Sequence, residues 1–191
     1  MIGHLDQQLF LFLNSFHSPF FDEVMWIISA RVTWIPLYIA ILVALGIKYK
    51  RKFLIIILMI IIAVLLSDRI SFYIKNGVER LRPSHEPAIE GLVHIVKGYS
   101  GGLYGFVSAH ASNAFMVAVL SLSLIRKKWF TYSIIFWALL VGYSRIYLGV
   151  HYPGDVLCGS ILGVLIGWSV IRLYGFIDKK LLPRSGYFST V

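Results

Sequence analysis

The stretch SRIYLGVHYPGD, residues 144–155, sets an arginine, a histidine and an aspartate between two long apolar runs. Charged and titratable side chains are costly at a membrane and mark a functional site unless they are paired. His151 comes just before Tyr-Pro-Gly, so we expect it on a turn, with Asp155 four residues further on. Asp155 would then accept a proton from one imidazole nitrogen and leave the other nitrogen free to attack phosphorus.

Two other polar groups come earlier in the chain. KNGVERLRP, residues 75–83, carries Lys75 and Arg82, and VSAH, residues 107–110, stands at the start of an apolar run. Together with Arg145, these residues would bring three positive charges to one place, where an anion is needed to offset their repulsion. Arg offers a planar fork and Lys a point charge to a phosphate, so the sequence predicts a phosphate pocket.

VSAH supplies the remaining groups of this pocket. We expect Ser108 to offer its hydroxyl, and the first amides of the helix, near Ala109 and His110, to offer N–H groups and a favourable dipole. His110 would donate a proton to the departing alkoxide as a general acid. The surrounding positive charges would stabilise the phosphoryl group during its transfer.

Each group also has a structural explanation when it is taken alone. Lys and Arg at a membrane edge often extend to lipid headgroups, and a single His at a helix end is more often a structural hydrogen-bonding residue. A His and an Asp four residues apart can be half of a metal site, but the neighbouring cations would repel a divalent ion. We therefore expect no metal and no cofactor. The structural explanations do not account for three polar groups at one surface.

Composition decides the class of protein. Hydrophobic residues make up 58% of the 191 positions, 14% of residues are charged, and the mean hydropathy is +0.78. A soluble domain carries about a quarter charged residues, so we expect an all-α polytopic bundle of membrane helices, with residues 1–191 as a single domain. Spans of about 20 apolar residues are predicted at 25–47, 53–74, 108–125, 129–147 and 156–177.

Much of the net charge of +9 lies in clusters that follow apolar runs, which indicates cytoplasmic loops rather than nucleic-acid binding. These clusters are Lys48–Lys52, Arg126–Lys128 and Lys179–Arg184. The spans then carry the three polar groups to the opposite face, where residues 75–107 form a non-cytoplasmic loop. Residues 5–16 are predicted to form an amphipathic helix in the interface. Residues 5–30 leave open whether five or six helices cross the membrane.

Two features outside the pocket carry their own expectations. Gly159, Gly163 and Gly167 recur every four residues in the last span, and we expect this smooth face to pack against another helix of the chain. Asp68 lies within the second span, where an acid is costly. Either it supports the pocket, or it pairs with Arg69 or with a polar group of another helix.

KNGVERLRP, VSAH and SRIYLGVHYPGD, in this order, resemble the three-part signature of the type 2 phosphatidic acid phosphatase family of integral membrane lipid phosphatases. The first and third match Lys-x6-Arg-Pro and Ser-Arg-x5-His-x3-Asp. The second departs from Pro-Ser-Gly-His at Val107 and Ala109 but keeps Ser108 and His110. The apolar topology also resembles the six-helix bundle of that family.

This resemblance implies a metal-independent phosphatase with a phosphohistidine intermediate, in which His151 is the nucleophile, Asp155 orients it and His110 is the acid. Phosphate would be bound by Lys75, Arg82, Ser108, Ala109 and Arg145. The substrate would be a lipid phosphate whose tail stays in the bilayer. Undecaprenyl diphosphate is favoured over phosphatidylglycerophosphate, phosphatidate and a lipid A phosphate. The protein would lie in the inner (plasma) membrane, with its active site facing the periplasm or the cell exterior.

Two alternatives from other classes stay open. In the first, a membrane phosphotransferase passes the phosphate to a lipid acceptor rather than to water. In the second, a non-catalytic protein binds lipid phosphates through the cations alone. The presence of His110, His151 and Asp155 argues against simple binding, which would not need them. The sequence leaves the oligomeric state undetermined.

Overall fold

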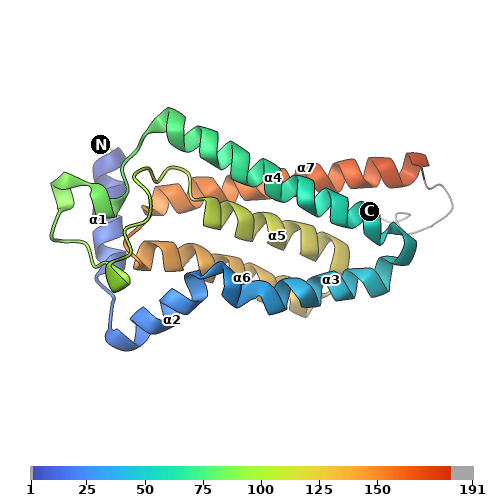
Figure 1. Cartoon of the computed structure of the whole chain (residues 1–191), viewed down its shortest axis with the longest axis horizontal. Coiled ribbons are helices and arrows are strands. Elements are labelled where there is room, and N and C mark those ends of the chain that lie inside the picture. Colours follow the sequence, from blue (N-terminus) through green and yellow to red (C-terminus); the bar gives the residue numbers. More distant parts are fainter. Residues whose placement is uncertain (1, 182–191) are drawn as a thin grey trace.

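The computed structural model describes residues 2–181. These residues form helices that are joined by short connections and one long loop (Figure 1). The main helices are α1 (Ile2–Asn14), α2 (Pro19–Ser29), α3 (Ile35–Tyr49), α4 (Phe53–Val78), α5 (Ala109–Ile125), α6 (Lys128–Tyr147) and α7 (Pro153–Leu181). Helices α3 to α7 run alongside one another as a bundle, and α1 lies across one end of it. The predicted all-α class is confirmed for the described residues.

The predicted span 25–47 is not one straight helix. Helix α2 ends at Ser29, Ala30 is extended with φ −74° and ψ 126°, and a 3-10 turn, η1 (Arg31–Trp34), leads into α3. Pro36 lies in the first turn of α3, where its missing N–H leaves no helical hydrogen bond unmade. The break at Ala30 places the buried Ser29 and the exposed Arg31 at the lining of one cavity.

The outer faces of the bundle helices are apolar. Leu54 on α4 is 76% exposed and Ile47 on α3 is 73% exposed, with many other large hydrophobic side chains exposed on α6 and α7. Exposed apolar surface of this extent indicates contact with lipid. By length and composition, the segments Arg31–Val78, which contains α3 and α4, and Pro153–Lys179 are candidates to cross a bilayer.

The two ends of the bundle differ in charge. The turns that join α3 to α4 and α5 to α6 lie at the same end as the last turns of α7 (Figure 1). These segments carry the three basic clusters, although Arg184 lies outside the described residues. Lys48 Nζ donates to the carbonyls of Leu124 at 2.7 Å and Ile125 at 3.1 Å, where the last turn of α5 leaves carbonyls unpaired. We refer to this as the basic end.

The glycine repeat of α7 packs against α5, as predicted. A side-chain carbon at Gly159 or Gly163 would overlap the carbonyl oxygens of Ser108 and Ser112 of α5. At Gly167 it would lie 2.9 Å from Cβ of Val119. Glycine therefore lets the backbones of these two helices approach closely, and this contact aligns the beginnings of α5 and α7.

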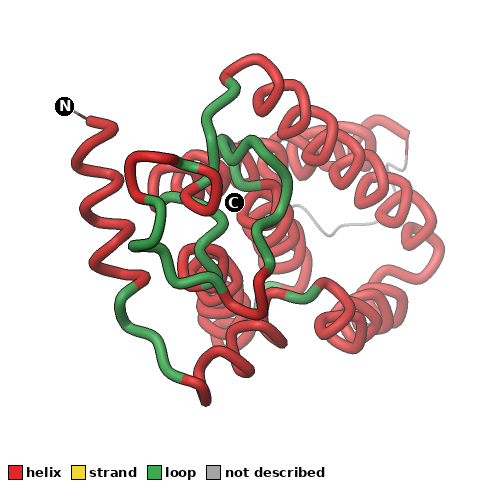
Figure 2. The backbone as a smooth tube through the Cα atoms, turned by 60° about the vertical axis from the view of Figure 1, so that its left-hand side comes forward, coloured by secondary structure: helices red, strands yellow, loops and turns green. Residues whose placement is uncertain are grey.

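The other end of the bundle is covered by α1 and the loop between α4 and α5 (Figure 2). Phe10 of α1 is fully buried and meets the Tyr152 ring edge-on, with 5.4 Å between centroids. Asn14 donates to the carbonyls of Ile146 at 3.2 Å and Tyr147 at 2.9 Å. With 13 and 11 residues, α1 and α2 are each shorter than a membrane of about 30 Å requires.

Candidate active site

The long loop after α4 is held by a small antiparallel pairing. The N–H of Arg82 donates to the carbonyl of Leu103 at 3.1 Å, and the N–H of Gly105 donates to the carbonyl of Arg80 at 2.8 Å. An antiparallel bridge between Leu81 and Tyr104 completes the pairing. It fixes the two sides of the loop across the end of the bundle.

This loop positions the two cations of KNGVERLRP. Lys75, in the last turn of α4, donates from Nζ to the carbonyl of Gly105 at 2.9 Å and to that of Val107. Arg82 donates from Nε to the carbonyl of Tyr104 at 3.1 Å. Both charges are therefore held in place by main-chain carbonyls, and no carboxylate forms an ion pair with either of them among the described residues.

Helix α5 begins at the residues of VSAH. Ser108 is its N-cap, and its hydroxyl accepts a long hydrogen bond of 3.5 Å from the N–H of Ala111. The N–H of Ser108 donates to the main-chain carbonyl of Asp155 at 2.9 Å, which joins this helix start to that of α7. Ala109 and His110 occupy the first turn, where N–H groups have no intrahelical acceptor.

His151 and Asp155 face each other across the turn before α7. His151 Nδ1 lies 3.5 Å from Asp155 Oδ2, and neither side chain is more than 2% exposed. The distance is longer than a good hydrogen bond, and Nδ1 has no hydrogen-bond partner among the described residues. Oδ2 also accepts from the N–H of Tyr152 at 3.0 Å, which holds the carboxylate toward the turn.

The charge state of His151 follows from its surroundings. Burial, and then the positive charges of Arg82, Arg145 and Lys75, lower the pKa of His151 well below its ordinary value of 6.5. The imidazole is therefore neutral at neutral pH, with an unprotonated nitrogen available for attack.

Arg145 enters the site from the last turn of α6. It is 3% exposed, donates to the hydroxyl of Ser29 of α2, and lies over the ring of Tyr99 with 5.7 Å from its central carbon to the ring centroid. Its Nε is buried and has no hydrogen-bond partner among the described residues. Ser29 and Tyr99 were not predicted, because the break after α2 and the fold of the loop bring them here.

Arg80 is a site residue that the sequence pattern does not predict. It donates to Asp155 Oδ1 at 2.8 Å and to Asp6 of α1 at 2.8 Å, and its guanidinium lies 4.1 Å from the centroid of the Tyr152 ring. Asp6 also accepts from the N–H of Gly154 at 2.8 Å. Its position inside KNGVERLRP was the only signal, since the partners lie far away in the sequence.

The structure brings the three polar groups together at one end of the bundle. Arg82 Nη1 lies 3.5 Å from the carbonyl of Val150, next to His151. A side-chain carbon at Gly105 would lie 2.9 Å from Asp155 Oδ2 and 3.3 Å from Cγ of Arg82. Since this end is opposite the basic end, the predicted separation of the polar groups from the basic clusters is present in the fold.

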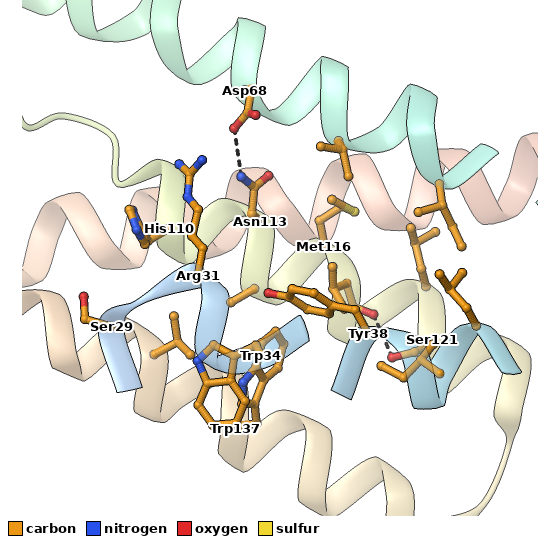
Figure 3. Close-up of a pocket in the computed structure, with 18 residues that line it drawn as sticks. Ser29, Arg31, Trp34, Tyr38, Asp68, His110, Asn113, Met116, Ser121 and Trp137 are labelled. Carbon is orange, nitrogen blue, oxygen red and sulfur yellow. Dashed lines mark hydrogen bonds between the residues drawn. The ribbon is translucent and has the colours of Figure 1, made fainter. Parts of the chain in front are cut away.

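His110 faces a cavity of about 340 Å³ between α3, α4, α5 and α6 (Figure 3). Ser29, Arg31, Asp68 and Asn113 line the same cavity near His110, and the rest is lined mostly by apolar side chains, together with Tyr38 and Ser121. Asp68 accepts a hydrogen bond of 2.8 Å from Asn113 of α5. Of the two expectations for Asp68, pairing with a polar group of another helix is therefore the one observed.

Comparisons with known proteins identify relatives of this chain. The family described as PAP2 superfamily matches residues 52–178. A lipid A 4'-phosphatase from Bacteroides thetaiotaomicron is 40% identical over 96% of this chain and 81% of its own length. A lipid A 4'-phosphatase from Porphyromonas gingivalis is 36% identical over 96% and 79%. The crystal structure of a transmembrane PAP2 type phosphatidylglycerolphosphate phosphatase from Bacillus subtilis superposes with a TM-score of 0.68, at 28% identity, over 94% of this chain and 87% of that one.

Proposed function

The chain belongs to the PAP2 superfamily and is a membrane phosphatase that acts on lipid phosphates, and we propose that its substrate is a lipid A phosphate. The observation that carries this choice is that two relatives, each matching 96% of the chain, are both named for lipid A. The sequence alone favours undecaprenyl diphosphate, with a lipid A phosphate as an alternative. The comparisons change the preferred substrate from undecaprenyl diphosphate to a lipid A phosphate, and both are membrane lipid phosphates.

The proposed reaction passes through a phosphohistidine. A ring nitrogen of His151 attacks phosphorus, so an N–P bond forms and the bond from phosphorus to the lipid oxygen breaks. His110 donates a proton to that departing oxygen. Water then attacks phosphorus, the N–P bond breaks, and His110 takes up a proton from the water as inorganic phosphate leaves. The lowered pKa of His151 supports this role, because only the neutral ring can attack.

The cations bind the phosphate oxygens in this proposal. Lys75, Arg82 and Arg145 surround the site, and the first N–H groups of α5, at Ala109 and His110, add donors at the positive end of the helix dipole. The buried Nε of Arg145 has no partner among the described residues, and a phosphate oxygen would provide its acceptor. Ser108 holds the start of α5 through its cap, and its hydroxyl faces the same helix start.

The membrane orientation is also a proposal. The basic end carries the Lys and Arg clusters that mark cytoplasmic loops, so the site faces the periplasm or the cell exterior in the inner (plasma) membrane. The lipid then keeps its tail in the bilayer while its phosphate reaches the ends of α5, α6 and α7.

Phosphate release from the purified protein in nanodiscs tests this function. We expect a lipid A phosphate to give a higher kcat/KM than phosphatidate, phosphatidylglycerophosphate or undecaprenyl diphosphate. His151→Ala should lower the rate by about 10³-fold or more, and equal rates in both proteins would refute the mechanism. Transfer of the phosphate to a second lipid, in place of release into water, would show the phosphotransferase. Binding without turnover in wild type would show the binding protein.

A further inference from the structure

The cavity beside His110 reaches the proposed general acid but is not lined by Lys75, Arg82, Ser108 or Arg145 (Figure 3). Ser29, which accepts a hydrogen bond from Arg145, lines the same end of the cavity as His110. Side chains such as Ile41, Val64 and Leu120 line the rest. A volume of about 340 Å³ is within the range of sites that bind small molecules. The apolar part suits an acyl chain, and the polar residues near His110 need a separate explanation.

In the hydrogen bond between Asp68 and Asn113, the donor and the acceptor can be assigned. Asn113 Nδ2 donates to Asp68 Oδ1 at 2.8 Å, and the amide must be oriented this way because its oxygen would repel the carboxylate. Asn113 Oδ1 is buried and has no hydrogen-bond partner among the described residues. An acceptor left without a donor inside a membrane bundle is costly. The pair therefore presents acceptor oxygens that a ligand donor would satisfy.

Arg31 adds donors to the same place. It follows the break at Ala30, and its side chain extends into the cavity between His110 and Asn113 (Figure 3). In the part of the chain that the structure describes, its guanidinium makes no hydrogen bond and no ion pair. A guanidinium carries five N–H donors, which suit carbonyl or other oxygen acceptors of a ligand.

A ligand that pairs with the polar groups of Arg31, Asp68 and Asn113 must carry both hydrogen-bond donors and acceptors close to its phosphate. A polyprenyl chain carries neither, and the ester linkages of a diacylglycerol phosphate carry carbonyls but no donor. Phosphatidylglycerophosphate adds one glycerol hydroxyl but has no amide. An acylated amino sugar carries amide N–H, amide carbonyl and hydroxyl groups beside its phosphate. We propose that Arg31, Asp68 and Asn113 form a recognition site for the amide and hydroxyl groups of an acylated amino-sugar phosphate, with its acyl chain in the apolar part of the cavity.

This inference rests on the proposed function and names the feature of the substrate that the chain recognises. A site that hydrogen-bonds a substrate hydroxyl or amide disfavours an analogue without it, because the polar groups of the protein are then left unpaired. Recognition of this kind makes the site selective among lipid phosphates that share the same phosphate chemistry.

A competition assay separates this site from the proposed reaction. The full-length protein is assayed in detergent with p-nitrophenyl phosphate as the reporter substrate, and two phosphate-free lipids with the same acyl chain are added as inhibitors. One is an N-acyl glucosamine, and the other is the methyl ester of the same fatty acid, which has no donor. In wild type we expect the amino-sugar lipid to inhibit at a concentration about 10-fold lower.

The variants decide which residues cause this difference. Arg31→Met should bring the two inhibitory concentrations to within about 2-fold of each other. The double variant Asp68→Leu with Asn113→Leu removes both polar partners together, so it leaves no buried group unpaired and should give the same result while folding normally. Arg69→Gln, at the exposed position next to Asp68, is the matched control and should keep the wild-type ratio.

The outcomes against the proposal are distinct from failure of the proposed function. Equal inhibition by the two lipids in wild type, or an unchanged ratio in both variants, would overturn the recognition site. A large loss of p-nitrophenyl phosphate turnover in Arg31→Met would also overturn it, since Arg31 would then serve the phosphate. Hydrolysis of a lipid A phosphate, measured in parallel, tests the proposed function alone.

Discussion

Arg80 joins Asp155 to the N-terminal helix. Its two terminal nitrogens lie 2.8 Å from Asp155 Oδ1 and 2.8 Å from Asp6 Oδ2, and the Asp155 side chain is fully buried. Asp155 faces His151, so one guanidinium connects α1 to the proposed nucleophile. This pairing also supplies the positive charge that a buried carboxylate requires.

Arg80 is expected to position Asp155 without binding the substrate. Arg80→Gln should lower kcat by about 10- to 100-fold and change KM by less than about 3-fold, because Asp155 loses its charged partner. Arg80→Lys should recover part of the loss, since it keeps the charge but cannot reach both carboxylates through a planar fork. Steady-state kinetics measure the effects on kcat and on KM separately. A rise in KM with kcat unchanged would instead make Arg80 a phosphate ligand.

His110 is predicted to act on the leaving group. His110→Ala should lower the rate for a lipid phosphate by about 10²- to 10⁴-fold, because an alkoxide leaves poorly without a proton. The loss should be smaller for p-nitrophenyl phosphate, since nitrophenolate leaves without protonation. Both rates are measured on the same preparation. Equal losses on the two substrates would contradict a general-acid role.

The pH profile should reflect the lowered pKa of His151. Because burial and nearby cations keep the ring neutral, its protonation should not reduce kcat/KM until the pH falls below about 6.5. The substrate phosphate also titrates, so its pKa is measured separately by ³¹P NMR and its effect is removed from the pH profile of kcat/KM. An acid limb at or above the ordinary pKa, assigned to His151, would contradict this prediction.

The same shift has a consequence for stability. Below pH 6.5 the unfolded chain binds a proton at His151 that the folded protein does not bind, so a fall in pH favours the unfolded state. The contribution of the neutral His151 to the free energy of unfolding is therefore complete only above that pH. It is lost as the pH falls toward the folded-state pKa.

The contact between α5 and α7 can be tested with one methyl group. Gly163→Ala should destabilise the protein by about 1–3 kcal/mol, because the added carbon would overlap the carbonyl of Ser112. Activity should also fall, since the start of α5 carries His110. Gly175→Ala on the same helix is the control, because a side-chain carbon there meets nothing within 4 Å. Thermal unfolding in detergent that gave equal values for both variants would contradict this account.

Much of the fold follows from local patterns in the chain. Apolar runs of sufficient length form helices, and glycines at intervals of four form the face of α7 that packs on α5. The spacing of His151 and Asp155 across Tyr-Pro-Gly places them face to face, 3.5 Å apart. The predicted first span, 25–47, is instead broken at Ala30, next to Arg31.

By itself, the sequence determined the helical class, the opposite placement of the basic clusters and the polar groups, and the identity of the residues suited to phosphate chemistry. These properties depend on composition and short spacings. Only the tertiary structure decided that Arg80 binds Asp6, 74 residues away, and that Arg31 shares a cavity with Asp68 and Asn113. Such contacts depend on how helices pack and where a helix breaks, and no local pattern encodes which distant side chains then meet.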